Sequence, residues 1–255
     1  MGRILEVRGL SKRFGALWAV RDLSFAVERG TLTALIGPNG SGKSTTFNLV
    51  CGFLRPDRGE ILFEGHSLGG LPPERIARLG IARTFQTPQV FGHLTVLENV
   101  LLAIYQRRRP GLLASLLRTP GFFAAERQAQ REALSYLERF FLAEEARKPA
   151  RDLPLGKLRC LELARALALR PKLLLLDEVA SGLSPREKED LAEALQGLPA
   201  QGVTLFWVEH DLHLLMGLAE RVIVLHQGTK IAEGAPLSIQ QHPEVIRVYL
   251  GEEEC

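Results

Sequence analysis

The sequence is short of several features that would place a protein in a class at once. Only three cysteines occur among 255 residues, and no two of them form a C-x-x-C pair. Their spacing predicts neither a disulfide framework nor a zinc site, and a reducing compartment suits them best. No apolar run approaches the roughly 20 residues that a membrane span requires, and the first residues lack the pattern of a secretion signal. We expect a chain that does not cross a membrane by itself.

Charge of one sign is also scarce. The formal net charge is +3, and the densest basic run is RRRP at residues 107–110. So mild a balance implies a nucleic-acid partner only where the charge is concentrated in a patch, and a single short run is typical of a solvated loop. We therefore expect no nucleic-acid function. The length and the hydrophobic fraction of 46% instead favour a compact globular protein with a subdomain.

Several short apolar runs do not alternate as half-exposed strands do. They cover residues 31–37, 81–85, 172–177 and 203–208. Runs of this kind are typical of parallel strands that are covered on both faces. Helical patterns follow or intervene at residues 42–52, 185–197 and 211–219. This succession of strand and helix predicts an α/β core with a mainly parallel sheet.

Other regions have a different hydrophobic pattern. Residues 4–10 and 19–28 mix alternation with β-branched and aromatic side chains, which predicts an N-terminal antiparallel β subdomain. Residues 221–234 predict a hairpin that turns at Gln227 and Gly228.

Between about residues 88 and 160 the patterns are helical, which predicts an inserted helical subdomain. We expect the core to occupy residues 1–87 and 161–255 on either side of it. Within the insertion, residues 107–121 include a short amphipathic piece that is either a packed connector or a contact with a membrane or a partner.

The stretch GPNGSGKS directly follows an apolar strand and opens a helix. In that context a G-x-x-x-x-G-K-S match predicts a nucleoside triphosphate site, because the glycines let backbone N–H groups and the helix N-terminus point at phosphate oxygens. Lys43 supplies a positive charge at the β- and γ-phosphates, and Ser44 a hydroxyl for Mg²⁺. The predicted nucleotide-binding residues here are Gly37, Pro38, Asn39, Gly40, Ser41, Gly42, Lys43, Ser44 and Thr45.

Two acids stand at the end of the apolar strand KLLLLD, where charge is costly unless it is solvated or used. Asp177 suits the magnesium shell, and Glu178 suits a general base that polarises the attacking water. A helix cap is the simpler role for either acid alone, and the P-loop favours the chemical one.

Gln86 and His210 also lie just beyond predicted strands. A polar residue there is usually only part of a turn, but ligands of open parallel sheets collect outside the carboxyl ends of the strands. Gln86 could then reach Mg²⁺ or the attacking water, and His210 could donate to the γ-phosphate. We expect both to meet Ser44, Asp177 and Glu178 around one triphosphate.

Phe14, beside Gly15 in the antiparallel subdomain, is a candidate to stack on a purine ring. Such stacking is worth about 1–3 kcal/mol by analogy with base–aromatic contacts. Core packing is the alternative for Phe14, and Trp18 is the weaker candidate.

Taken in order, the P-loop, Gln86, the helical insertion, DLPLGKLRC, LLLLDE, SGLS and EHD resemble the ATP-binding subunits of ABC transporters over essentially the whole chain. The chain is most similar to those of branched-chain or hydrophobic amino-acid uptake systems, through KRFGALWAV, IARTFQ, the long RRRPGLLASLLRTP segment, WVEHDLHLLMGLA and HPEVIRVYLG. The resemblance implies a P-loop NTPase core, ATP and Mg²⁺ as cofactors, separate membrane permeases as partners and, indirectly, a solute-binding protein. It also implies a place at the cytoplasmic face of the cell membrane.

In that family two subunits, identical or paralogous, hold each ATP between one P-loop and the other subunit's signature, usually LSGGQ or LSYGQ. Here the signature reads LPLGK. The resemblance implies that Gly156 approaches the partner's nucleotide, but Pro154 lacks the hydroxyl and the N–H of the family serine, and Lys157 replaces a neutral glutamine. Val179 and Ser184 also depart from the usual proline and Asn or Asp.

These departures predict two unequal sites. The one that this chain completes with a partner's normal signature should hydrolyse ATP, and the opposite one should be slower, since losing directed donors costs about 2.7–4 kcal/mol, or roughly a hundred- to thousandfold in rate.

Other functions stay open at this point. Urea, amides or other amino acids are alternative solutes, and a poorly hydrolysing regulatory ATPase is an alternative role that Glu178 and His210 disfavour. A soluble cassette ATPase acting on DNA or ribosomes would be expected to carry two cassettes or a long coiled coil. A P-loop kinase or GTPase would need neither EHD nor a signature, and no NKxD occurs.

Overall fold

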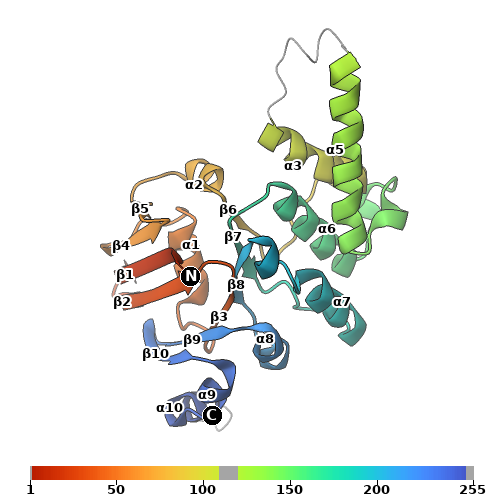
Figure 1. Cartoon of the computed structure of the whole chain (residues 1–255). Coiled ribbons are helices and arrows are strands. Elements are labelled where there is room, and N and C mark those ends of the chain that lie inside the picture. The colour runs from red at the N-terminus through yellow and green to blue at the C-terminus, as the bar shows by residue number, and fades with distance from the viewer. Residues whose placement is uncertain (1, 109–119, 251–255) are drawn as a thin grey trace. The chain divides into compact units, whose positions relative to one another are not determined.

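The computed structural model describes residues 2–108 and 120–250 (Figure 1). The chain divides into two compact units. The first unit comprises Met1–Arg83, Lys172–Ser181 and Gln196–Cys255, and the second comprises Thr84–Pro171 and Gly182–Leu195. The second unit therefore includes a piece of chain well beyond residue 160, the end that the sequence predicts for the insertion.

A six-stranded sheet forms the centre of the first unit, in the order β10-β9-β3-β8-β7-β6. Its strands are β3 (Leu32–Ile36), β6 (Ile81–Arg83), β7 (Leu173–Asp177), β8 (Thr204–Val208), β9 (Arg221–His226) and β10 (Thr229–Gly234). All neighbours pair in parallel except β10, which closes antiparallel on β9. The parallel sheet and the hairpin are confirmed, and the hairpin adds β9 directly beside β3, which the sequence did not indicate.

Strand β6 is shorter than predicted. Residues 81–85 were expected to be extended, but the ladder with β7 ends where Arg83 pairs with Leu175. Because β6 is an edge strand, it has only this one partner. The N–H of Phe85 instead donates to the side chain of Glu162, so the chain leaves the sheet two residues early.

A second, antiparallel sheet of the first unit has the order β2-β1-β4-β5. It consists of β1 (Arg3–Phe14), β2 (Leu17–Glu28), β4 (Arg58–Phe63) and β5 (His66–Ser67). The antiparallel subdomain is thus confirmed, with β4 and β5 added. Apolar side chains from both sheets form one core with helix α1 (Lys43–Val50), where Phe47 packs 5.1 Å from Phe206 between ring centroids.

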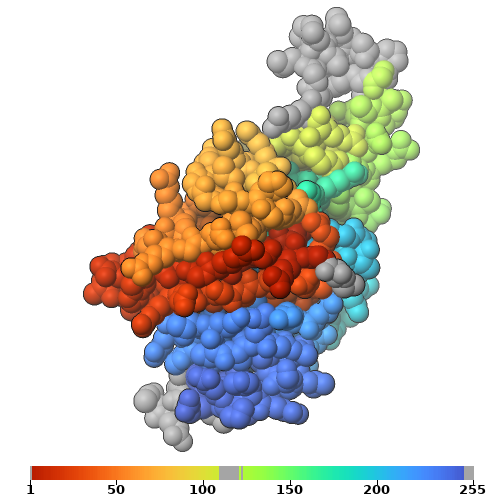
Figure 2. All heavy atoms as spheres, turned by 60° about the vertical axis from the view of Figure 1, so that its left-hand side comes forward, coloured from red at the N-terminus to blue at the C-terminus, as the bar shows by residue number. Residues whose placement is uncertain are grey.

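The remaining helices of the first unit are short. They are α2 (Pro73–Leu79), η3 (Pro199–Gln201), α8 (Leu212–Leu218), α9 (Pro236–Gln240) and α10 (Pro243–Leu250). Figure 2 shows the N-terminal strands, in red, directly against the C-terminal segment, in blue. Hydrogen bonds support this contact, since the N–H of Arg21 donates to the carbonyl of Gly228 at 2.8 Å.

In the described part of the second unit the regular structure is helical, and residues 84–94 are irregular. Its helices are α3 (Val96–Arg108), α5 (Pro120–Arg139), η1 (Ala143–Glu145), η2 (Ala150–Asp152), α6 (Leu155–Ala168) and α7 (Pro185–Leu195). Helices α3, α5 and α6 pack against one another. The predicted helical subdomain is confirmed, while the amphipathic piece within residues 107–121 falls mostly on 109–119, outside the described residues.

Candidate functional site

Three neighbouring strands of the first unit end at the same level of the sheet. Val208 of β8 is paired with Leu35 of β3 on one side and with Asp177 of β7 on the other. The P-loop follows β3, Glu178 follows β7 and His210 follows β8, so strand register alone brings these groups to one edge. This is the arrangement that the sequence predicted for the carboxyl ends of parallel strands.

The P-loop runs tightly against its surroundings. A Cβ added at Gly37 would meet the carbonyl oxygen of Leu225 at 2.1 Å, and one at Gly42 would meet that of Ala19 at 2.4 Å, with φ of 149° and 104°. Only glycine fits both the close approach and the positive φ. The loop therefore presents its backbone rather than side chains, as a phosphate cradle requires.

Lys43 and Ser41 are buried in this loop. The ammonium of Lys43 donates to the carbonyls of Gly37 at 2.6 Å and Pro38 at 2.9 Å. The Oγ of Ser41 is buried and has no hydrogen-bond partner among the described residues. A buried hydroxyl without a partner, a buried cation and a glycine cradle fit a bound phosphate. Ser44 and Asn39 are exposed, and Thr45 is half-buried.

Asp177 is held by a residue that the sequence reading passed over. Arg83, on β6, donates to Asp177 Oδ2 and to Asn48 Oδ1, both at 2.7 Å, and the side chains of Arg83 and Asp177 are each 8% exposed. A buried arginine in the apolar strand IARTF was the available signal, since such a charge needs a partner. Arg83 thus orients the carboxylate that was predicted to serve Mg²⁺.

Glu178 and His210 meet directly. The imidazole Nε2 of His210 lies 2.9 Å from Glu178 Oε1, and the imidazole is about half exposed while the carboxylate is mostly covered. Glu178 has a φ of 50°, a left-handed value that is uncommon for a non-glycine residue and is often found at functional sites. Its N–H donates to the carbonyl of Val208 at 2.8 Å, which ties the turn after β7 to the end of β8.

Glu209, a second residue that the sequence did not indicate, is buried beside this pair. Its carboxylate accepts the N–H of Ala180 at 2.9 Å and the N–H of His210 at 3.2 Å. Burial raises the pKa of the Glu209 carboxyl. An acid that directly continues the apolar strand TLFWV was its signal in the sequence.

Phe14 lies at the turn between β1 and β2, and the residue is 48% exposed. Core packing is therefore excluded, and the ring is free to offer a face, with the Lys12 ammonium 5.7 Å from its centroid. Because Ala19 of β2 contacts Gly42, this turn lies near the P-loop. Trp18 is half-buried beneath the Arg13 guanidinium at 5.8 Å.

Gln86 and Gly156 belong to the second unit. Gln86 is exposed on the irregular segment before α3. Gly156 is the buried second residue of α6, where an added Cβ would lie 2.0 Å from Glu187 Oε1. That carboxylate caps α7, because its other oxygen accepts the N–H and the hydroxyl of Ser184 at 2.8 and 2.7 Å.

The departures around Gly156 have visible consequences. Pro154 is the N-cap residue of α6 and provides no side-chain cap. The ammonium of Lys157 is paired with Glu145, a largely buried carboxylate, and this contact lowers the pKa of the Glu145 carboxyl. The positive charge of Lys157 is therefore balanced within its own unit.

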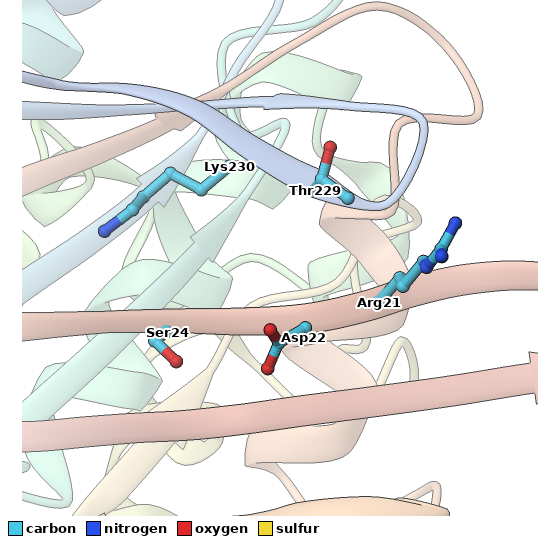
Figure 3. A pocket seen from close by; sticks show the side chains of 5 residues that line it. All are labelled: Arg21, Asp22, Ser24, Thr229 and Lys230. Carbon is cyan, nitrogen blue, oxygen red and sulfur yellow. The ribbon is translucent and has the colours of Figure 1, made fainter.

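A groove elsewhere in the first unit carries no comparable arrangement. Arg21, Asp22 and Ser24 of β2 line it together with Thr229 and Lys230 of β10. Figure 3 shows that Arg21 and Lys230 extend toward opposite sides, so the polar groups do not converge on one point. We assign no function to this groove.

In residues 2–108 and 120–250, no helix has the length and apolarity to cross a bilayer.

Comparison with known proteins gives consistent matches. A family model described as "ABC transporter" matches residues 20–181, and one described as "Branched-chain amino acid ATP-binding cassette transporter" matches residues 229–255. The chain is 43% identical over 250 residues to the high-affinity branched-chain amino acid transport ATP-binding protein LivG of Escherichia coli (strain K12), with 98% of each chain covered. It is 42% identical to BraF of Pseudomonas aeruginosa, a protein of the same description, with the same coverage.

Solved structures agree with this. The ADP conformation of MJ1267, an ATP-binding cassette of an ABC transporter, superposes with a TM-score of 0.82 at 32% identity, and 98% of this chain and 100% of that chain are covered. A nucleotide-free ATP-binding cassette from an ABC transporter gives the same score and identity, with coverage of 97% and 99%.

Proposed function

Because the chain belongs to the ATP-binding proteins of ABC transporters, we propose that it powers the uptake of branched-chain amino acids by hydrolysing Mg²⁺-ATP at its P-loop. Membership of this family gives the chain its ATPase activity and its binding of nucleotide. The choice of solute rests on the relatives named LivG and BraF and on the match of the C-terminal segment.

The pair of Glu178 and His210 is the observation that carries the catalytic part. A carboxylate held 2.9 Å from an imidazole at the edge that bears the P-loop is placed to take a proton from an attacking water. His210, with Nε2 near both this carboxylate and solvent, can donate to oxygens on which charge develops. The Glu209 carboxylate holds the backbone of both segments that carry this pair, because it accepts the N–H of Ala180, shortly after Glu178, and the N–H of His210.

The phosphates are proposed to be bound by the P-loop. Lys43 would exchange its contacts with the carbonyls of Gly37 and Pro38 for phosphate oxygens, and the hydroxyl of Ser41 would gain a partner. Ser44, Gln86 and Asp177 are the residues proposed to hold Mg²⁺, which would neutralise negative charge on the phosphates. Phe14 is proposed to stack on the purine, and its exposed ring supports that role.

The partners of this chain are proposed from those of ABC transporter subunits. Membrane permease subunits would carry the solute, and a second cassette, identical or paralogous, would complete each ATP site. The chain would then act at the cytoplasmic face of the membrane, and a solute-binding protein would deliver the amino acid outside.

Glu178→Gln tests the catalytic proposal. The amide preserves the shape of the side chain but cannot take a proton, so we expect hydrolysis to fall at least about a hundredfold. Binding of ATP should persist, as equilibrium dialysis would show. As a control, Glu189→Gln changes an exposed carboxylate of α7 and should hydrolyse ATP as the wild type does. Equal turnover by Glu178→Gln and wild type would contradict the proposal.

The signature LPLGK supports a further proposal, that the site completed by this chain's α6 is the slower of two. Pro154→Ser restores a hydroxyl at the N-cap, and we expect it to raise turnover in the assembled transporter. Lys157→Gln alone would leave the buried Glu145 without its cation, so it should be compared with Lys157→Gln combined with Glu145→Gln. No gain in Pro154→Ser or in the double variant would contradict the asymmetry.

A further inference from the structure

An irregular segment joins β6 to α3, and Gln86 lies near its beginning. Residues 84–94 form neither helix nor strand, so no regular hydrogen-bond ladder fixes the position of Gln86. Backbone polar groups in such a segment need other partners if the segment is to hold one conformation. Here side chains from α3 and α6 supply them.

Glu162 makes the contacts nearest to Gln86. A single carboxylate oxygen, Oε1, accepts the N–H of Phe85 at 3.3 Å and the N–H of Gln89 at 3.1 Å. The side chain therefore bridges the residue just before Gln86 and one shortly after it. Glu162 is only 6% exposed, on a stretch of α6 rich in leucine and alanine. A carboxylate in such a place is costly unless directed N–H groups compensate it.

Two more side chains hold the rest of the segment. Arg165, one turn beyond Glu162 on α6, donates to the carbonyl of Gln89, and its guanidinium lies 4.8 Å from the ring centroid of Phe91. Asn99 of α3 accepts the N–H of Phe91 at 2.9 Å and donates to its carbonyl at 3.0 Å. Glu162 thus acts beside Gln86, whereas Asn99 acts five residues further along.

We propose that Glu162 is a positioning residue for ATP hydrolysis, which fixes the backbone around Gln86 through the N–H groups of Phe85 and Gln89. This rests on the proposed function, from which Gln86 takes its role toward Mg²⁺ and the attacking water. Glu162 acts only through Gln86. Position matters at this point because a displacement of about 1 Å can cost roughly a hundredfold in rate.

Steady-state kinetics of the full chain test the kinetic consequence. Glu162→Ala should lower kcat roughly ten- to a hundredfold, but no further than Gln86→Ala does, and the KM for ATP should change less than about twofold. Glu162→Gln retains an acceptor oxygen and should recover most of the rate. Because Glu162 acts through Gln86, the double variant should equal Gln86→Ala. Losses that multiply in the double variant would overturn the proposal.

Asn99→Ala is the matched control, since it removes buried hydrogen bonds from the same segment at Phe91. It should lower stability to urea as much as Glu162→Ala does, or more, and leave kcat within about threefold of wild type. If the two variants lower kcat equally, Glu162 has only a structural role and the proposal fails.

Hydrogen exchange adds a measurement that needs no hydrolysis. In Glu162→Ala the amides of Phe85 and Gln89 should exchange at least about tenfold faster while that of Phe91 is spared, and Asn99→Ala should give the reverse. Unchanged exchange at Phe85 and Gln89 would overturn the positioning role whatever the ATPase assays give. If the wild-type chain itself hydrolyses no ATP, faster exchange at Phe85 and Gln89 in Glu162→Ala would still support the positioning role. That combination would overturn only the proposed function.

Discussion

The two units position their candidate residues by different means. In the first unit, Asp177 ends β7, and Glu178 and His210 come shortly after β7 and β8, whose register puts them at one edge of the sheet. In the second unit, Gln86 lies in an irregular segment that is held by the buried carboxylate of Glu162. Gly156 lies at the start of α6, next to the capping carboxylate of Glu187. A ladder of backbone hydrogen bonds can be read from apolar runs, whereas a single carboxylate that holds a loop cannot.

The largest expected effect tests whether strand register alone holds the first unit's site. Arg83→Met removes the guanidinium from the buried carboxylate of Asp177 while it keeps an unbranched apolar side chain. Breaking one side of a buried ion pair costs about 3–5 kcal/mol, and we expect that loss in the free energy of unfolding measured with urea.

The matched control removes the other charge as well. Arg83→Met combined with Asp177→Asn no longer buries a carboxylate without its cation, so part of the lost stability should return. If Arg83→Met unfolds at the same urea concentration as wild type, the ladder alone is sufficient and the ion pair is dispensable to the fold.

Much of the first unit could be predicted from sequence. The parallel strands, the P-loop and the acids at the end of β7 all follow from local patterns, and the six-stranded sheet places them as expected. Arg83 and Glu209 were missed because their partners, Asp177 and the N–H of Ala180, are distant in sequence. Burial of a charge becomes informative only when the partner is known.

The second unit was predicted in outline only. Its helical periodicity was legible, but nothing local indicates that Glu162 bonds to residues more than seventy positions earlier, or that Lys157 pairs with Glu145 rather than pointing toward a phosphate. Strand β6 was predicted two residues too long for the same reason, since Phe85 is apolar enough for a strand but its N–H is bound by Glu162.

A smaller effect should distinguish two buried acids by the sign of their pH dependence. Burial raises the pKa of Glu209 above its usual 4.5, so the folded state keeps the proton longer and stability falls as pH rises past that value. The hydrogen bond from Lys157 lowers the pKa of Glu145, so stability rises as pH climbs toward 4.5 and is lost below it.

Glu209→Gln and Glu145→Gln should therefore diverge. Relative to wild type, Glu209→Gln should gain stability as pH rises above 4.5, whereas Glu145→Gln should lose stability as pH rises toward 4.5, as urea unfolding at several pH values on both sides of 4.5 would show. Parallel pH profiles of the two variants would contradict the assignment of opposite shifts.

The smallest expected effect concerns Gly156, where the second unit's use of carboxylates can be tested by one methyl group. In Gly156→Ala the new Cβ would lie 2.0 Å from Glu187 Oε1, so the flexible carboxylate must turn away and release Ser184 at the start of α7. Loss of such a cap costs about 1 kcal/mol. Gly217→Ala in α8 is the control, because no atom of the part of the chain that the structure describes lies within 4 Å of its added Cβ, and alanine favours helix by about 1 kcal/mol. Thermal unfolding should rank Gly217→Ala at or above wild type and Gly156→Ala below Gly217→Ala. An equal gain in thermal stability in the two variants would mean that the Glu187 carboxylate moves without cost. The role of Gly156 would then be to let a ligand come close to α6, and not to allow the packing of α6 against α7.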